Sequence, residues 1–331
     1  MSDLPMAESA PLPRTASRVP KLIVCVVGLA ALIAVPFFCN SYVQYIINLM
    51  IVYALVALGF NIVLGYLGQL AFANAAFFGI GAYATGILME HLAIPFWLAL
   101  PLGGIAGAAA GFLVGLPALR LKGYYLAIVT LVFGELMRWG YIHGGDVTRG
   151  STGLGLPPAT VPGFTLDSDA HKYYAFLVVA ILVIWATVNV LRSRIGRAWV
   201  AIRENEPAAA SLGFSPAFYK VAAFAWSGFV VGIAGGLFAV LLGRITPESF
   251  NLHHLLLEFA LVMIGGLGSV TGAILGAIIL TAAPELLRNF PGFEELFFSL
   301  LLIIVLLFMP RGLYGQIAKV MPRLREPLYR D

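Results

Sequence analysis

Charged residues and cysteines are scarce in this sequence. Only 11% of its 331 residues are charged, 60% are hydrophobic, and the mean hydropathy is +0.94. A water-soluble domain cannot cover so much apolar surface with so few polar side chains, so a soluble protein is excluded. The net charge of +4 comes from arginines and lysines at the ends of apolar segments, which indicates orientation in a membrane and not binding of nucleic acid.

The sequence also lacks the motifs of several enzyme classes. Its two cysteines, Cys25 and Cys39, lie in the first apolar segment without disulfide or metal-ligand spacing. No G-x-x-x-x-G-K-[ST] phosphate loop is present, so ATP hydrolysis by that route is excluded. His253 and His254 are adjacent, but no carboxylate or cysteine pattern accompanies them, and no nucleophile and base are arranged for catalysis. We expect no metal, no resident cofactor and no catalytic residues in this chain.

Long apolar segments dominate the rest of the chain and predict an all-α, polytopic transmembrane protein. A helix needs about 20 apolar residues to cross a bilayer. Apolar segments cover residues 22–38, 42–64, 70–89, 94–116, 124–142, 173–191, 221–242, 254–283 and 294–309. We expect about 8 to 10 spans, including broken or re-entrant helices, in a membrane domain at 22–310. A disordered cytoplasmic tail at 1–21 and a basic cytoplasmic tail at 311–331 flank it. Five glycines between 103 and 115 predict a face for tight helix packing.

Two glycine-rich interruptions occur inside the apolar segments. The stretch Gly265-Gly266-Leu267-Gly268-Ser269 predicts a broken or re-entrant element, because three complete crossings after residue 220 would leave the basic tail outside. The stretch Gly65-Tyr66-Leu67-Gly68-Gln69 interrupts an earlier segment, 200 residues before it. The two stretches have glycines and leucines at matching positions. This similarity is explained either by an internal repeat or by chance similarity between glycine-rich stretches.

Polar residues around these interruptions are candidates for a translocation pathway. An ionised side chain at a helix centre costs about 2.5 to 3.5 kcal/mol on insertion scales, so polar groups inside spans need a reason. The candidates are Asn61, Gly65, Gly68, Gln69, Asn74, Gly265, Gly266 and Gly268. The alternative role of the three amides is hydrogen bonding between helices. Glu135 and Arg138, three residues apart, predict a mainly structural pair, and Glu258 is expected to reach the membrane interface.

The only long polar run between apolar segments is residues 192–220. Pro207 suits an early helical position and Gly213 a left-handed helix end, which predicts a short exposed helix on a tether. Ser215 and Pro216 then start the next helix. The run belongs on the cytoplasmic side because it contains four arginines, Arg192, Arg194, Arg197 and Arg203. The alternative is an ordinary basic connection held near anionic head groups.

Several stretches of the sequence point to one transporter family. Within residues 192–220 they are, in order, GR (196–197), AIREN (201–205), AA (208–209) and Gly213. This order is similar to the cytoplasmic coupling loop of the ABC-transporter permeases that import branched-chain amino acids. Other similar stretches are GYLGQL (65–70), AFFGIGAY (76–83), LRLKGYYLAIVTL (119–131), STGL (151–154), IGGLGS (264–269) and PRGL (310–313). Together they cover most of residues 45–315 and resemble the LivM-like branch of the family.

The resemblance implies a loop that docks on an ATPase subunit. The residues it marks in this loop are Gly196, Arg197, Arg203, Glu204, Glu206, Pro207, Ala208, Ala209 and Gly213. In the general importer pattern a glutamate directly precedes the two alanines. Here Pro207 holds that position and Glu206 comes one residue early.

The resemblance also implies a set of partners and a place in the cell. It implies a multi-pass permease in a bacterial inner membrane, with both termini cytoplasmic. Its partners would be a second related permease, two ATPase subunits that bind the ATP, and a periplasmic solute-binding protein. Branched-chain amino acids are the implied solutes, and urea, short amides and aromatic acids are alternatives within the family. An ion-coupled secondary transporter is the alternative from another class, but the sparse intramembrane charge counts against it.

Overall fold

The computed structural model describes residues 35–36, 39–161, 164–166, 168–287, 300, 303 and 312–320. Met1–Asn40 and Ser41–Asp331 form two separate units, and every labelled helix and strand belongs to the second. The expected tail at 1–21 lies outside the described residues. The expected spans at 22–38 and 294–309 also lie outside them, except for a few residues.

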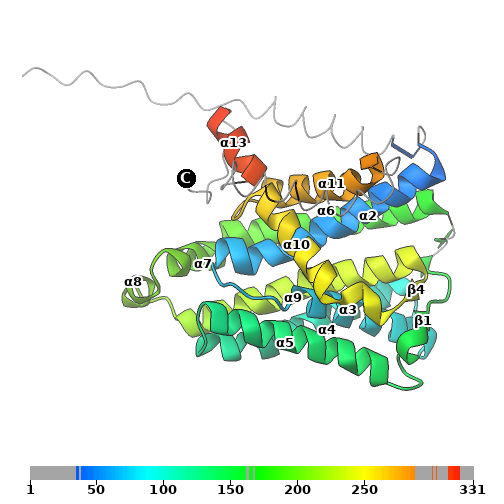
Figure 1. The fold of residues 1–331 in the computed structure, drawn as a ribbon, viewed down its shortest axis with the longest axis horizontal. Coiled ribbons are helices and arrows are strands. Elements are labelled where there is room, and N and C mark those ends of the chain that lie inside the picture. The colour runs from blue at the N-terminus through cyan, green and yellow to red at the C-terminus, as the bar shows by residue number, and fades with distance from the viewer. Residues whose placement is uncertain are drawn as a thin grey trace, which may run out of the picture. The chain divides into compact units, whose positions relative to one another are not determined.

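The described part of the second unit is built almost entirely of helices (Figure 1). Its α-helices are α2 (Ser41–Asn61), α3 (Asn74–Glu90), α4 (Phe96–Gly115), α5 (Tyr124–His143), α6 (Asp169–Arg192), α7 (Arg194–Glu204), α8 (Glu206–Ser211), α9 (Pro216–Leu242), α10 (Leu252–Gly265), α11 (Val270–Leu287) and α13 (Gly312–Val320). A π-helix, η1 (Ile62–Tyr66), extends α2, and three short 3₁₀ helices are η2 (Pro117–Leu119), η3 (Gly150–Thr152) and η4 (Pro247–Phe250). Two antiparallel pairs of two-residue strands join β1 (Leu154–Gly155) to β4 (Arg244–Ile245) and β2 (Thr160–Val161) to β3 (Phe164–Thr165).

Five helical stretches among the described residues are long and apolar enough to cross a membrane. They are Ser41–Tyr66, Phe96–Leu119, Tyr124–His143, Asp169–Arg192 and Pro216–Leu242. Leu252–Gly265 and Val270–Glu285 are apolar but shorter. These helices confirm an all-α, multi-pass membrane protein, while the expected 8 to 10 spans stay a prediction.

Helix α9 lies at the centre of the packing, against α4, α3 and α2. Glycines of α4 face glycines of α9, and a methyl group added to Gly107 would lie only 3.0 Å from the Cα of Gly232. Ser227 of α9 donates a hydrogen bond of 2.7 Å to the carbonyl of Gly59 in α2. The small-residue face expected in the fourth segment is therefore present and lets the backbones of α4 and α9 approach closely.

The third apolar segment is not helical from its expected start at residue 70. After η1 the chain passes Gly68, which has a left-handed φ of +73°, and it stays non-helical until Asn74. The hydroxyl of Thr130 in α5 accepts a 2.7 Å hydrogen bond from the backbone N–H of Phe72, so this irregular backbone is supported by protein. Asn74 and Ser227 line one small cavity, so α3 begins beside the middle of α9.

Helices α10 and α11 form the expected broken element. Gly266 and Gly268, with φ of 123° and 75°, turn the chain between them. The two helices then pack against each other, since a methyl group on Gly272 would lie 2.8 Å from the carbonyl oxygen of Gly265. The basic tail expected after residue 310 includes α13, whose Tyr314 is buried and which packs on α10 and α11.

Candidate functional site

Residues 192–220 fold into two helices that pack on the body of the protein. Ser193 separates α6 from α7, and its hydroxyl caps α7 by accepting a 3.1 Å hydrogen bond from the N–H of Ile195. Trp199 is fully buried, and its Nε1 donates a 2.8 Å hydrogen bond to the carbonyl of Tyr219 in α9. The expected tether is therefore wrong for residues 194–204. Ala198, Trp199 and Ile202 share one helical face, and burying that face fixes α7 in place.

Helix α8 is the short exposed helix that the sequence predicts. It begins at Glu206, one residue before Pro207, because the side chain of Asn205 caps it by accepting a 3.0 Å hydrogen bond from the N–H of Ala208. Gly213 ends the helix in a left-handed conformation, with φ of +87°. Ala209 faces inward and is buried, whereas Leu212 is 76% exposed. In Figure 1, α8 lies at the opposite end of the helices from β1 and β4.

Glu206 fixes α8 to two other parts of the chain. Its carboxylate oxygens lie 2.7 Å from Nζ of Lys220 in α9 and 2.8 Å from Nζ of Lys122, just before α5. Burial alone would raise the pKa of Glu206, but the hydrogen bonds and charges of Lys122 and Lys220 outweigh it and lower the pKa below its ordinary value. Glu206 comes one residue earlier than the glutamate of the general importer pattern, and at this position it still has a structural partner, the buried Lys220. Sequence reasoning missed both lysines.

Arg203, at the end of α7, joins this segment to the first glycine interruption. Its Nη1 donates a hydrogen bond of 2.7 Å to the carbonyl oxygen of Gly65 in the π-helix. The arginine side chain also passes close to Gly68, where an added methyl group would lie 3.2 Å from Arg203 Cδ. The last carbonyl groups of a helix have no partners within it, and Gly65 lies in the last turn of η1, so Arg203 supplies a charged donor to one of these carbonyls.

Asn61 joins the first interruption to the second. Its Nδ2 donates a 2.7 Å hydrogen bond to the carbonyl of Ser269, and its Oδ1 accepts a 2.9 Å hydrogen bond from the N–H of Gly268. Asn61 is completely buried. We call the set Asn61, Gly65, Gly68, Arg203 and Gly268 the glycine junction. Two interruptions that lie 200 residues apart in the sequence thus meet at one point, in contact with α7.

The other predicted site residues lie outside the glycine junction. Gly265 and Gly266 are positions of close packing against α11 and α13. Gln69 has a buried side-chain oxygen with no hydrogen-bond partner among the described residues. Gly196 lies against the carbonyl of Leu191 at the bend between α6 and α7. The remaining coupling-loop residues make local contacts or are exposed: Glu204 pairs with Arg203 at 3.0 Å, and Arg197 donates to the carbonyl of Arg192 at 3.3 Å.

Asn74 belongs to a second polar pair, with Glu258 of α10. Asn74 Nδ2 donates a 2.8 Å hydrogen bond to Glu258 Oε2, and the two residues are 2% and 1% exposed. The expectation that Glu258 reaches the membrane interface is therefore wrong. The sequence offered one signal that Glu258 belongs with the site residues. It lies seven residues before Gly265, in the segment that leads to the second interruption.

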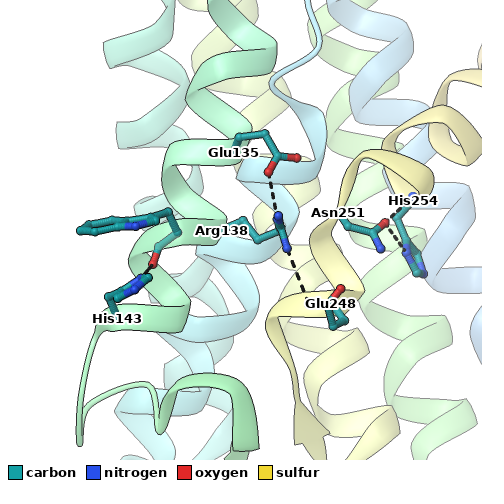
Figure 2. Close-up of polar contacts among 7 residues, drawn as sticks. Glu135, Arg138, His143, Glu248, Asn251 and His254 are labelled. Atoms are coloured by element: carbon teal, nitrogen blue, oxygen red, sulfur yellow. Dashed lines mark hydrogen bonds and ion pairs between the residues drawn. The ribbon is translucent and has the colours of Figure 1, made fainter.

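Glu135 and Arg138 form the ion pair that their spacing predicts, with Arg138 Nε 2.9 Å from Glu135 Oε2. Figure 2 shows that Arg138 also points toward Glu248 in η4, at 3.6 Å. Next to it, the side chain of Asn251 caps α10 by accepting a 3.0 Å hydrogen bond from the N–H of His254. These contacts join α5 to the start of α10. Among the described residues no group of histidine, cysteine and carboxylate side chains could hold a metal ion.

Comparisons with known proteins relate the chain to transport proteins. A family profile described as "Branched-chain amino acid transport system / permease component" matches residues 42–310. The chain is 35% identical over 321 residues to the high-affinity branched-chain amino acid transport system permease protein LivM of Escherichia coli K12, covering 90% of this chain and 76% of that protein. The corresponding LivM of Salmonella typhimurium is 35% identical, covering 85% of this chain and 72% of that protein.

More distant similarity extends to a second group of permeases. The permease protein LivH of Salmonella typhimurium is 26% identical, covering 80% of this chain and 91% of that protein. No solved structure matches the chain. The extent of the family match and the identity to the LivM proteins are sufficient to assign the chain: it belongs to the family of permease components of branched-chain amino acid transport systems.

Proposed function

We propose that this chain is the membrane-spanning permease subunit of an ATP-driven importer for branched-chain amino acids or closely related small solutes. In this proposal α8 docks on a partner ATPase, which binds and hydrolyses ATP, and α7 transmits its movement into the membrane. Two ATPase subunits, a second related permease and a periplasmic binding protein complete the importer. The chain would lie in a bacterial inner membrane, with α8 and both termini on the cytoplasmic side.

The observation that carries the proposal is the hydrogen bond from Arg203 to Gly65. It links the segment proposed to meet the ATPase directly to the glycine junction, at 2.7 Å. Helix interruptions of this kind are tolerated at membrane depth only where protein or a water-filled path satisfies the backbone. A displacement of α7 would therefore act on both interruptions at once, because Asn61 joins them.

The contacts of α8 favour its movement as one body with α7, the start of α9 and the segment before α5. The Asn205 cap closes the connection between the two helices, and Glu206 binds α8 to Lys220 and Lys122. The outward face of α8, including Pro207, Ala208 and Leu212, is exposed. A small, exposed helix that is rigidly held on its inner side is suited to fit into a groove of a partner protein.

Exposed apolar side chains on α4, α5 and α6 support contacts with lipid and with a second permease. Examples are Phe112 (50% exposed), Trp139 (59%) and Trp185 (65%). Large apolar side chains left exposed on several helices mark surfaces that lipid or a partner protein covers. We assign these faces to the bilayer and to the partner permease, and the end that carries β1 and β4 to the binding protein.

The test is purification of the tagged protein from its native membrane, followed by reconstitution and uptake of labelled solutes. The proposal expects an ATPase, a second permease and ATP-dependent uptake of leucine, isoleucine or valine when the binding protein is added. Uptake of urea, an amide or an aromatic acid instead would change the substrate and keep the importer. Purification of the chain without an ATPase, combined with uptake driven by an ion gradient, would overturn the proposal.

A further inference from the structure

The buried pair of Glu258 and Asn74 has unused hydrogen-bonding capacity. Glu258 Oε1 and Asn74 Oδ1 are both buried, and neither has a hydrogen-bond partner among the described residues. Glu258 takes part in none of the ion pairs that form within the described part of the chain. Buried polar atoms in native proteins are almost always paired, so two neighbouring acceptors without donors indicate a place for a ligand that donates hydrogen bonds.

The charge at this place favours a cationic donor. Asn74 is the first residue of α3, and Ala73 before it offers no side-chain cap, so the positive end of the α3 dipole lies beside the carboxylate of Glu258. Among the described residues neither this helix end nor Asn74 supplies a counter-ion for the glutamate. A primary ammonium group carries three donors and one positive charge, and it can satisfy Glu258 Oε1 and Asn74 Oδ1 together.

The surroundings of Asn74 are mostly apolar. Asn74 lines a cavity of about 10 Å³, together with Phe60, Val63, Phe77, Phe224 and Ser227. The cavity has room for a single water at most, so a ligand enters only when α3 and its neighbours separate. An aliphatic body next to an ammonium group matches this combination of phenylalanine side chains and a buried carboxylate.

The two acceptors are placed where movement of the glycine junction would separate them. Asn74 follows the first interruption on α3, and Glu258 precedes the second interruption on α10. The junction holds the interruptions together through Asn61 and Arg203. Opening the junction would therefore move α3 relative to α10 and expose both acceptors.

We propose that Glu258 and Asn74 form an ammonium-binding site on the translocation pathway, which takes the amino group of a small aliphatic amino acid or amine. The inference rests on the proposed function, because it places the site in the path of a transported solute. In the structure the site is closed, and Asn74 Nδ2 donates a hydrogen bond to one of the two carboxylate oxygens of Glu258.

The first test uses ligands that separate the charges of leucine, with the wild-type importer complex purified without its binding protein. 3-Methylbutylamine carries the ammonium group alone and 4-methylpentanoate the carboxylate alone. The thermal unfolding midpoint of the nucleotide-free and vanadate-trapped complexes is measured with each compound. The inference expects leucine and 3-methylbutylamine to raise the midpoint in at least one state and 4-methylpentanoate to leave it unchanged.

The second test uses Glu258→Gln, which removes the charge and keeps the shape, beside Glu135→Gln as the matched control. Glu135 is also on a membrane helix but is paired with Arg138 near the surface. Glu258→Gln should weaken the response to the amine at least tenfold and lower leucine uptake, Glu258→Asp should restore part of both, and Glu135→Gln should retain both. An equal response to the amine and the acid, or an unchanged amine response in Glu258→Gln, would overturn the inference.

The two proposals can fail separately. A wild-type complex that imports branched-chain amino acids but does not respond to the amine would refute the ammonium site alone. A complex that responds to the amine but shows no ATP-dependent solute uptake would refute the proposed function and leave the site standing. Should Glu258→Gln fail to assemble, the comparison of ligands on the wild-type complex decides the question.

Discussion

Replacing Arg203 by methionine removes the contact that connects α7 to the glycine junction. A hydrogen bond to or from a charged group contributes about 1.5 to 3 kcal/mol. The Arg203 side chain is 24% exposed, so the lower part of this range applies to its bond with Gly65. The ion pair with the half-exposed Glu204 adds about 0 to 1 kcal/mol. The total of about 2 kcal/mol corresponds to a factor of about 30 in the equilibrium between docked and released α7.

The expected result of Arg203→Met is loss of coupling and not loss of the complex. Nothing in the outward face of α8 changes, so the ATPase should still bind and hydrolyse ATP. Solute uptake per ATP hydrolysed should fall severalfold, because the motion of α7 reaches the glycine junction less often.

The assay is simultaneous measurement of uptake and ATP hydrolysis in proteoliposomes. Arg194→Met is the matched control, since Arg194 lies on the same helix, is exposed, and is not among the residues assigned to the coupling loop. Arg203→Lys should restore part of the coupling. The same ratio of uptake to hydrolysis in Arg203→Met, Arg194→Met and the wild type would refute a coupling role for Arg203.

Three further predictions concern stability. Gly65→Ala should destabilise the protein by about 1 to 3 kcal/mol in unfolding titrations, because its methyl group would meet Asn61 and the backbone of Gly268, whereas Gly140→Ala, with nothing within 4 Å, should be neutral or stabilising. Trp199→Ala should cost about 3 to 5 kcal/mol and expose residues 192–220 to protease, while Trp185→Ala, at a 65% exposed position, should do neither. Since the pKa of Glu206 is lowered below 4.5, its ion pairs stabilise the fold above about pH 4.5 and are lost as the pH falls through the folded pKa. The difference in thermal midpoint between wild type and Glu206→Gln should therefore be largest near neutral pH and shrink below pH 4.5, and a pH-independent difference would contradict the assignment.

Local signals in the sequence predicted much of the fold. Length and hydropathy located α2, α4, α5, α6 and α9, and the glycines at 265–269 located the turn between α10 and α11. Gly213 ended α8 as expected because its left-handed conformation is a local property of glycine. The boundaries of α3 were less accurate, because the support for the irregular stretch comes from Thr130 in another helix.

The contacts between distant segments could not be predicted in the same way. Asn61, Gly65 and Gly268 were selected one by one as pathway candidates, but nothing local indicates that Asn61 binds the backbone of Gly268 and Ser269. Arg203 was assigned to the loop alone, and its bond to Gly65 spans 138 positions of the chain. Helix α7 was interpreted as part of a tether because its arginines indicated an exposed segment. Its buried face is explained only by the contact of Trp199 with Tyr219, which lies in the next membrane helix.

The central claim is that α8 is the surface through which an ATPase acts on this permease. The most direct measurement is co-purification of the ATPase with Leu212→Glu, which places a charge at a 76% exposed position at the end of α8. Leu92→Glu is the control, at a 62% exposed position between α3 and α4. We predict that Leu212→Glu inserts into the membrane, loses the ATPase and stops uptake, whereas Leu92→Glu retains the ATPase. Equal recovery of the ATPase with both variants would contradict the account.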